Sequence, residues 1–500
     1  MMKIETARRL TFDVGWVFIS YIVTMAVGLF LKVLLGNFFD AEGLGAYSMV
    51  LTIWAIVTIT GAFGVPVAII TYVSQNKSKD NVRNTLVTSG LIFGLLVGLL
   101  ASVIVFILAP YMEFIFNIPN LGRLLRYVAP CFPFVIFNEM FSSYLNAIRH
   151  MRGFSLFDIF RNLGLLFVTV AMIWLGFGIE GAVMAMVIMP IATSIVALAY
   201  HRKVMTFRFR HFRIYTRRLI KFGSRLYFAS AAAMINTQVT VLLIGFYLAD
   251  TEVGIYSVAI MFFNALVMLP MAMQRVTFPT ISGYFAEKRL DKIKILMGMT
   301  LKFSFVFLSI MCLLMFYFVD DAIGLLFPGK ENFLLAVIPI QILAVMGLVY
   351  GTIAPVSILF TAAGKPDIPM KISIAKALVN VTLGVFLVPL SLTFLGYQIG
   401  GINGATIALG SSYILEVFLF FMLVKPKLGI RVKANAILRG LAAFIGVLGT
   451  GYVIAVCTDI DENISGAGLI FTYVIILMAI GLVTKKDISM GMSIIKKPGQ

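Results

Sequence analysis

Charged side chains inside long apolar stretches are the residues of this chain best suited to chemistry. The cations are Lys32, Arg161, Arg275, Lys302 and Lys376, and the acids are Glu139, Asp158 and Glu416. Placing such a group inside a membrane costs roughly 2.5–3.5 kcal/mol on insertion scales, so each is a candidate for a functional or pairing role. A set richer in cations suits an anionic ligand, because Arg can offer two parallel hydrogen bonds and Lys a point charge.

Two of these cations have a nearby acid at a similar depth. Glu139 and Arg161 lie on consecutive apolar runs, and Lys376 and Glu416 do the same further along the chain. Consecutive membrane helices run antiparallel, so each pair could form an internal ion pair. The alternative is that these side chains, with Asp158, contact the substrate or a coupling ion.

The remaining cations have no acid in an adjacent position. Arg275 and Lys302 lie roughly 10–12 Å from the ends of their runs at about 1.5 Å per residue, too deep for easy escape to the surface. Both are therefore expected to face a cavity. Lys32 lies near the end of the first run, where its long side chain could either reach the surface or line the same cavity.

The elements that carry these charges are apolar helices. The 500-residue chain is 61% apolar and 12% charged, against about 25% charged in a typical soluble protein. Runs of about 20 apolar residues can cross the roughly 30 Å hydrocarbon layer as helices. Fourteen are predicted, at approximately 12–36, 44–73, 84–109, 127–148, 154–176, 180–200, 219–248, 253–283, 295–319, 333–363, 368–388, 400–424, 435–457 and 464–484. The chain is predicted to be an all-α multi-pass membrane protein.

The distribution of basic residues predicts the topology. With a cytoplasmic N-terminus, 30 of the 40 Lys and Arg residues fall in cytoplasmic segments and three in external connections. This asymmetry is the positive-inside pattern, so both termini are predicted to be cytoplasmic in a cell membrane. The net charge of +18 therefore reflects topology and does not indicate a nucleic-acid partner.

The longest basic segment, 201–221, lies between the sixth and seventh runs and interleaves Arg and Lys with Phe. One interpretation is a linker that follows the positive-inside rule. The other is a segment that lies on anionic headgroups, where each Lys or Arg adds about 1 kcal/mol of attraction.

Cofactor chemistry has little support in the sequence. The three cysteines fall in apolar runs, and the three histidines lie in basic loops without acidic companions. This pattern argues against a disulfide framework and against a metal site, so no metal or other cofactor is expected.

A fingerprint occurs twice, 209 residues apart. Gly36 is followed nine residues later by 45–48 (GAYS), and Gly245 is followed nine residues later by 254–257 (GIYS). A second motif, GIEGA at 178, recurs as GINGA at 401, an offset of 223. Two motifs that recur in the same order indicate a duplicated unit of a little over 200 residues.

The duplication predicts the domain organisation. Six helices per unit is an even number, so both units enter the membrane in the same direction and should be related by an axis along the membrane normal. The prediction is two six-helix lobes, 1–200 and 219–424, joined by a linker at 201–218 and enclosing a central cavity. Residues 425–500 would add two further helices and a cytoplasmic tail.

The fingerprint also resembles a known family. Gly36 with 45–48, then 64–69 (GVPVAI) and Ser74-Gln75, is similar to the opening of the polysaccharide flippases of the multidrug/oligosaccharidyl-lipid/polysaccharide exporter superfamily. Twelve repeat-related helices plus two match its lipid-linked oligosaccharide branch. Those proteins usually carry an Arg near the Gly36 position, whereas the nearest cation here is Lys32.

The resemblance implies a transporter and not an enzyme. Its substrate would be a polyprenyl-diphosphate-linked oligosaccharide, moved from the cytoplasmic to the external leaflet by alternating access, with the diphosphate held by cavity Arg and Lys. Membrane lipids and other polysaccharide-assembly proteins would be partners. The added pair of helices would form an apolar groove for the lipid tail.

Other functions remain open from the residues alone. A peptidoglycan-precursor (lipid II) flippase and a multidrug/cation antiporter would share the fold. A membrane glycosyltransferase could use Asp40 and Glu42 to hold a metal, but these residues lie within the repeated fingerprint, where a turn explains them.

Overall fold

The computed structural model describes residues 2–76, 80–204, 208–209, 212–394, 397–430, 435–457 and 462–483, apart from some side chains within helices. The first helices are α1 (Met2–Ala62), α2 (Val65–Gln75), α3 (Asp80–Phe116), α4 (Leu121–Val128), α5 (Phe132–Ala147), α6 (Met151–Trp174), α7 (Gly178–Val204) and α8 (Phe212–Tyr247), with the 3-10 turn η1 (Ala129–Cys131) before α5.

The second half of the chain also consists mainly of helices. Its helices are α9 (Asp250–Ala286), α10 (Leu290–Tyr317), α11 (Val319–Leu326), α12 (Val337–Ile353), α13 (Val356–Ala362), α14 (Asp367–Leu387), α15 (Gly401–Leu428), α16 (Asn435–Cys457) and α17 (Glu462–Ala479), with the 3-10 helix η2 (Glu331–Ala336) before α12. The strands β1 (Thr393–Phe394) and β2 (Tyr397–Gln398) pair antiparallel, with Thr393 opposite Gln398.

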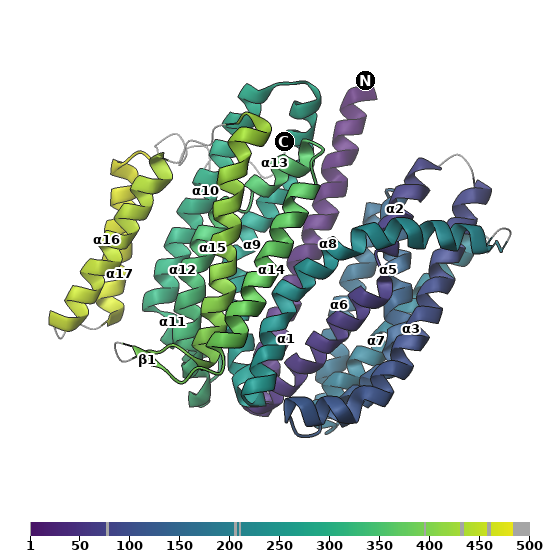
Figure 1. The fold of residues 1–500 in the computed structure, drawn as a ribbon, viewed down its shortest axis with the longest axis horizontal. Helices are drawn as coiled ribbons and strands as arrows, with labels where there is room; N and C mark the ends of the chain where they lie inside the picture. Colours follow the sequence, from purple (N-terminus) through teal and green to yellow (C-terminus); the bar gives the residue numbers. More distant parts are fainter. Residues whose placement is uncertain are drawn as a thin grey trace. The chain divides into compact units, whose positions relative to one another are not determined.

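The predicted membrane helices are confirmed. Ten described helices are long and apolar enough to cross a membrane, and the first, Gly15–Ala62, contains the first predicted run and most of the second, which continues into α2. Three further runs coincide with the shorter apolar helices Ala231–Tyr247, Ile437–Gly451 and Ile464–Ala479. All fourteen runs therefore lie on helices of an all-α membrane protein, whose chain path is shown in Figure 1.

The connection predicted between the first two runs is a kink and not a loop. Within α1, Asp40 alone has non-helical backbone angles, with φ 57° and ψ −170°. The corresponding position in the second fingerprint, 209 residues later, is Ala249, which lies in the short break between α8 and α9. Both copies therefore interrupt the helix at the same place.

The two fingerprint copies touch each other through their glycines. A Cβ added to Gly45 would lie 1.8 Å from the carbonyl oxygen of Asp250, and one added to Gly254 would lie 1.9 Å from that of Ala41. Asp250 is 209 residues after Ala41, as Gly254 is after Gly45. The contact is thus reciprocal, as between equivalent patches across a twofold axis. Only glycine permits this backbone approach.

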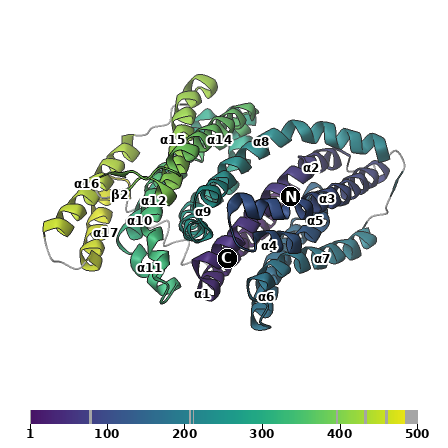
Figure 2. The same cartoon turned by 60° about the horizontal axis from the view of Figure 1, so that its bottom comes forward.

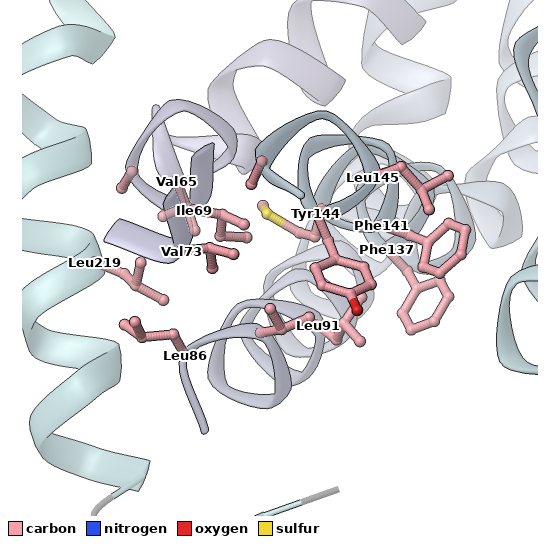
Figure 3. Packing of buried hydrophobic residues seen from close by; sticks show 14 of the residues in the cluster. Val65, Ile69, Val73, Leu86, Leu91, Phe137, Phe141, Tyr144, Leu145 and Leu219 are labelled. Atoms are coloured by element: carbon pink, nitrogen blue, oxygen red, sulfur yellow. The ribbon is translucent and has the colours of Figure 1, made fainter. Parts of the chain in front are cut away.

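The chain forms two compact units. The first comprises residues 1–258 and 380–405, and the second comprises 259–379 and 406–500. A core of the first unit joins α2, α3, α5 and α8, and Figure 3 shows Val65, Ile69 and Val73 of α2 facing Leu219 of α8. Pro66 at the start of α2 and the left-handed Gly64 (φ 70°) separate this helix from α1.

In the second unit, α16 and α17 pack on α10, which also packs against α12. Phe444 of α16 and Tyr473 of α17 share a buried cluster with Leu308 of α10 and Leu348 of α12. Figure 2 shows α16 and α17 side by side. The prediction that the added pair packs against the second repeat is therefore confirmed for these helices.

Candidate functional site

The first charged cluster, in the first unit, centres on Arg161 of α6. Its Nη1 donates to Glu139 Oε1 of α5 at 3.2 Å, and its Nη2 donates to Asp158 Oδ1 at 2.7 Å. Asp158 precedes Arg161 by three residues, which places both on one helix face. The predicted Glu139–Arg161 pair is present, and Asp158 joins it.

Polar side chains extend this cluster to α1. Asp158 Oδ2 accepts a hydrogen bond from Thr24 Oγ1 at 3.2 Å. Asn162 Nδ2 donates to Thr24 Oγ1 at 3.0 Å and to the carbonyl oxygen of Asp158 at 2.8 Å. The cluster thus joins two carboxyl groups to one guanidinium.

The second cluster, in the second unit, is the predicted pair of Lys376 on α14 and Glu416 on α15. Lys376 Nζ lies 2.5 Å from Glu416 Oε2, and each residue is 8% exposed. The ammonium also lies over the rings of Tyr413 at 5.0 Å and Tyr350 at 5.6 Å from their centroids. Phe263 of α9 stacks on Tyr413 with centroids 5.4 Å apart. The charge is thus neutralised inside an aromatic pocket.

Lys32 has a different partner. Its Nζ donates to the backbone carbonyl of Ser257 at 2.9 Å, and Ser257 is the last residue of the second fingerprint. Among the described residues Lys32 forms no ion pair. Its positive charge is therefore not offset by a carboxylate, at the point where the two fingerprint copies meet.

The other two cavity candidates are less defined. The Nζ of Lys302, on α10, lies 5.6 Å from the ring centroid of Phe303, and the residue is half-buried. Arg275 lies within α9, but its side chain is outside the described residues. The cavity-facing role of both residues stays a prediction.

Several polar residues that complete the clusters were missed by sequence reasoning. Asn162 follows Asp158 by four positions and Tyr413 precedes Glu416 by three, so helical spacing alone could have found these two. Thr24 and Tyr350 come from helices distant in sequence, so no local sequence pattern predicts that they join the clusters.

A further buried polar set holds α5 to α7. Asn138 Nδ2 donates to Thr193 Oγ1 at 2.7 Å and to the carbonyl oxygen of Pro190 at 3.0 Å, and Ser194 Oγ donates to Asn138 Oδ1 at 3.0 Å. Pro190 interrupts the hydrogen bonding of α7, and membrane helices satisfy such interruptions with polar side chains. This set is structural.

The arrangement can do two kinds of chemistry. The ammonium of Lys32, which has no carboxylate partner among the described residues, can bind an anion such as a phosphate. The carboxylates beside Arg161 can accept a proton or a cation. Within the described residues, no group of three or more His, Cys, Asp and Glu is placed to hold a metal ion.

Comparison with known sequences identifies two matching families and two relatives. Residues 10–285 match the family described as polysaccharide biosynthesis protein, and residues 226–386 match the MatE family. The lipopolysaccharide biosynthesis protein WzxC of Escherichia coli K12 is 24% identical over 461 residues, covering 86% of this chain and 88% of the relative. An uncharacterised membrane protein of Methanocaldococcus jannaschii is 23% identical over 438 residues, covering 82% and 83%.

Solved structures share the fold. The lipid II flippase MurJ, in an inward closed conformation, aligns with a TM-score of 0.74 at 16% identity, over 92% of this chain and 98% of that one. An inward-facing multidrug resistance MATE transporter aligns with a TM-score of 0.65 at 13% identity, over 82% and 94%.

The family match covers more than half of the chain, and the duplicated fingerprint and helix order agree with it. The protein belongs to the polysaccharide biosynthesis protein family.

Proposed function

We propose that the protein is a flippase that moves a polyprenyl-diphosphate-linked oligosaccharide from the cytoplasmic to the external leaflet of the cell membrane by alternating access. The family membership and the relative named for lipopolysaccharide biosynthesis support the glycan, and the likeness in fold to a lipid II flippase is compatible with a diphosphate lipid. Both termini are proposed to be cytoplasmic, on the asymmetry of Lys and Arg.

One observation supports the proposal that the protein binds the diphosphate of the substrate. Lys32 places an ammonium within an apolar helix and bonds it to a carbonyl oxygen, without a carboxylate among its described contacts. Even a half-buried cation in an apolar helix is costly unless it gains an anionic partner. The substrate diphosphate would be that partner during transport.

The other intramembrane charges would have different roles in the proposed site, depending on whether they already have partners of opposite charge. Arg275 and Lys302 would line the cavity with Lys32. Arg161 and Lys376 already have carboxylate partners, so either could reach the diphosphate only by sharing or leaving them. Glu139, Asp158 and Glu416 would hold these cations between substrate molecules or bind a coupling ion.

The lipid tail would lie beside α16 and α17. Both helices are largely apolar apart from Arg439 in the first turns of α16 and the first two residues of α17, and residues of both share a core with α10 and α12. A polyprenyl chain needs only such an apolar surface, so the pair would discriminate lipid-linked from free sugar.

Lipid II transport is the second candidate, because the fold match to a lipid II flippase extends over more of the chain than the matches to multidrug transporters. The diphosphate and polyprenyl parts are common to both substrates. Multidrug antiport has the support of the MatE match over residues 226–386 and of the likeness in fold to multidrug transporters, and an enzymatic glycosyl transfer conflicts with membership in a family of transporters.

Substitution of the cavity cations tests the proposal. In reconstituted vesicles, Arg275→Ala and Lys32→Met should each abolish translocation of lipid-linked oligosaccharide while folding stays near normal. Loss of a charge-assisted hydrogen bond, worth roughly 1.5–3 kcal/mol, should lower affinity for the diphosphate about tenfold or more. Lys32→Arg is the matched control and should retain transport. Wild-type rates in both variants would remove these residues from the site.

A further inference from the structure

The first turns of α8, residues 212–222, form an amphipathic helix at the junction between the two repeats. Leu219 is fully buried, and Tyr215, Ile220 and Phe222 pack against the same core. The opposite face is exposed and carries Arg213, Arg217, Arg218 and Lys221, together with Ile214. The exposed cations Arg213, Arg217 and Lys221 are spaced by four residues, so they form one stripe.

The cations of the basic stripe are not paired with acidic side chains in the part of the chain that the structure describes. Among the described residues, none of its cations forms an ion pair. Apolar side chains beside the stripe are exposed: Ile214 is 63% exposed, and Phe209, just before the helix, is also 63% exposed. A linker that merely follows the positive-inside rule needs neither an ordered amphipathic helix nor exposed apolar residues among its cations.

The direction of this helix fits a position at the membrane surface. Figure 1 shows the first part of α8 running across α2 and α3, which it contacts, before the helix bends and continues. A helix that lies across membrane-spanning helices, with cations and apolar groups on its outer face, has the composition of an interfacial helix.

We infer that residues 212–222 of α8 bind acidic phospholipid headgroups, with the stripe Arg213, Arg217 and Lys221 contacting phosphates. Ile214 and Phe209 enter the boundary between headgroups and acyl chains. Charge complementarity identifies the partner: several cations in one row suit a surface of many phosphates more than a single soluble anion.

Headgroup binding by α8 would affect the position of α2, because the two helices are in contact. The guanidinium of Arg218 lies 4.5 Å from the ring centroid of Tyr72 on α2, and Tyr72 contacts Phe222 with centroids 5.1 Å apart. The backbone of Gly223 meets the break before α2, since a Cβ there would lie 2.8 Å from the carbonyl oxygen of Phe63. A helix held on the membrane surface therefore also holds the start of α2.

The test uses the full chain in nanodiscs of phosphatidylcholine alone or with phosphatidylglycerol. Acidic lipid should raise the midpoint of thermal unfolding, and the rise should shrink as salt is added, because exposed charges are screened. The variant Arg213→Gln/Arg217→Gln/Lys221→Gln should lose most of this rise. The charge-keeping variant Arg213→Lys/Arg217→Lys/Lys221→Arg should retain it and shows that the site tolerates substitution.

The control removes the same charge elsewhere. Lys288, Lys294 and Lys425 are exposed and lie in other segments predicted to be cytoplasmic, so Lys288→Gln/Lys294→Gln/Lys425→Gln should leave the rise intact. An equal loss in the control, or a full rise in the α8 variant, overturns the inference. Inorganic phosphate added to neutral nanodiscs should have no effect, and a rise equal to that with acidic lipid would assign the stripe to a soluble anion.

Discussion

At the scale of residues, the intramembrane charges fall into groups according to the side chains or backbone groups that they contact. Lys376 and Glu416 neutralise each other behind aromatic rings, whereas Arg161 is shared between two carboxylates. Lys32 is bonded to a carbonyl oxygen. A cation whose charge is already offset adds little attraction for a phosphate. Lys32 is therefore the described cation best able to bind one, although Arg161 and Lys376 lie deeper in their helices.

The buried pair gives a stability prediction. Glu416→Gln leaves the ammonium of Lys376 without a carboxylate in an almost fully buried position, so the protein should lose about 3–5 kcal/mol of folding free energy. The double variant Lys376→Met/Glu416→Met removes both charges and should recover much of the loss. Thermal unfolding in detergent micelles measures both, with Glu331→Gln at an exposed position as the control. Equal stability of Glu416→Gln and wild type would contradict a functional ion pair here.

At the scale of elements, the repeated fingerprint is a contact between helices. Gly45 on α1 and Gly254 on α9 each meet the backbone of the other copy. The kink at Asp40 and the break before Asp250 bring these backbones together. The motif was conspicuous in the sequence because two segments that pack on each other must both lack side chains there.

Alanine at the fingerprint glycines should destabilise the protein. A Cβ at Gly45 or Gly254 would lie under 2 Å from a carbonyl oxygen, so the helices must separate, at a cost of about 1–3 kcal/mol or more. Gly28 is the matched control, because a Cβ there meets nothing within 4 Å, and Gly28→Ala should be neutral or slightly stabilising. Thermal unfolding midpoints of the three variants decide the matter. Similar midpoints for Gly45→Ala and Gly28→Ala would show that the close approach is unimportant.

Sequence predicted the helices well and the site in part. Long apolar runs identify membrane helices without tertiary information, since lipid forces every backbone group to bond internally. The pairs Glu139–Arg161 and Lys376–Glu416 were predictable because consecutive helices are neighbours at matching depth. Lys32 and Ser257 were not, because their contact joins residues 225 positions apart. The aromatic pocket around Lys376 was hidden for the same reason.

At the scale of the whole molecule, the duplication and the added helices make separate predictions. Residues 1–200 and 219–424 should superpose as six-helix lobes in an experimental structure, with residues after 425 outside the duplication. Lobes inverted relative to each other would contradict the parallel repeat.

The added pair of helices should matter for the lipid and not for the sugar. A chain ending at Ile430, which is itself buried, removes α16 and α17 and should bind lipid-linked substrate more weakly. Its binding of a water-soluble diphospho-sugar should be unchanged. Binding of both ligands to the two forms measures this. If the truncated protein folds and keeps full affinity for the lipid-linked form, the tail lies elsewhere.

The most direct test of the proposed function is translocation itself. The purified protein is reconstituted in vesicles that contain a polyprenyl-diphosphate-linked oligosaccharide, and a membrane-impermeant glycosidase reports the sugar that crosses the bilayer. The measurement is repeated with a proton gradient, a sodium gradient, a membrane potential and none of these. Wild-type protein should move the lipid-linked sugar in at least one condition, far above protein-free vesicles and above Lys32→Met. No movement above protein-free vesicles in any of the conditions would contradict a lipid-linked oligosaccharide flippase.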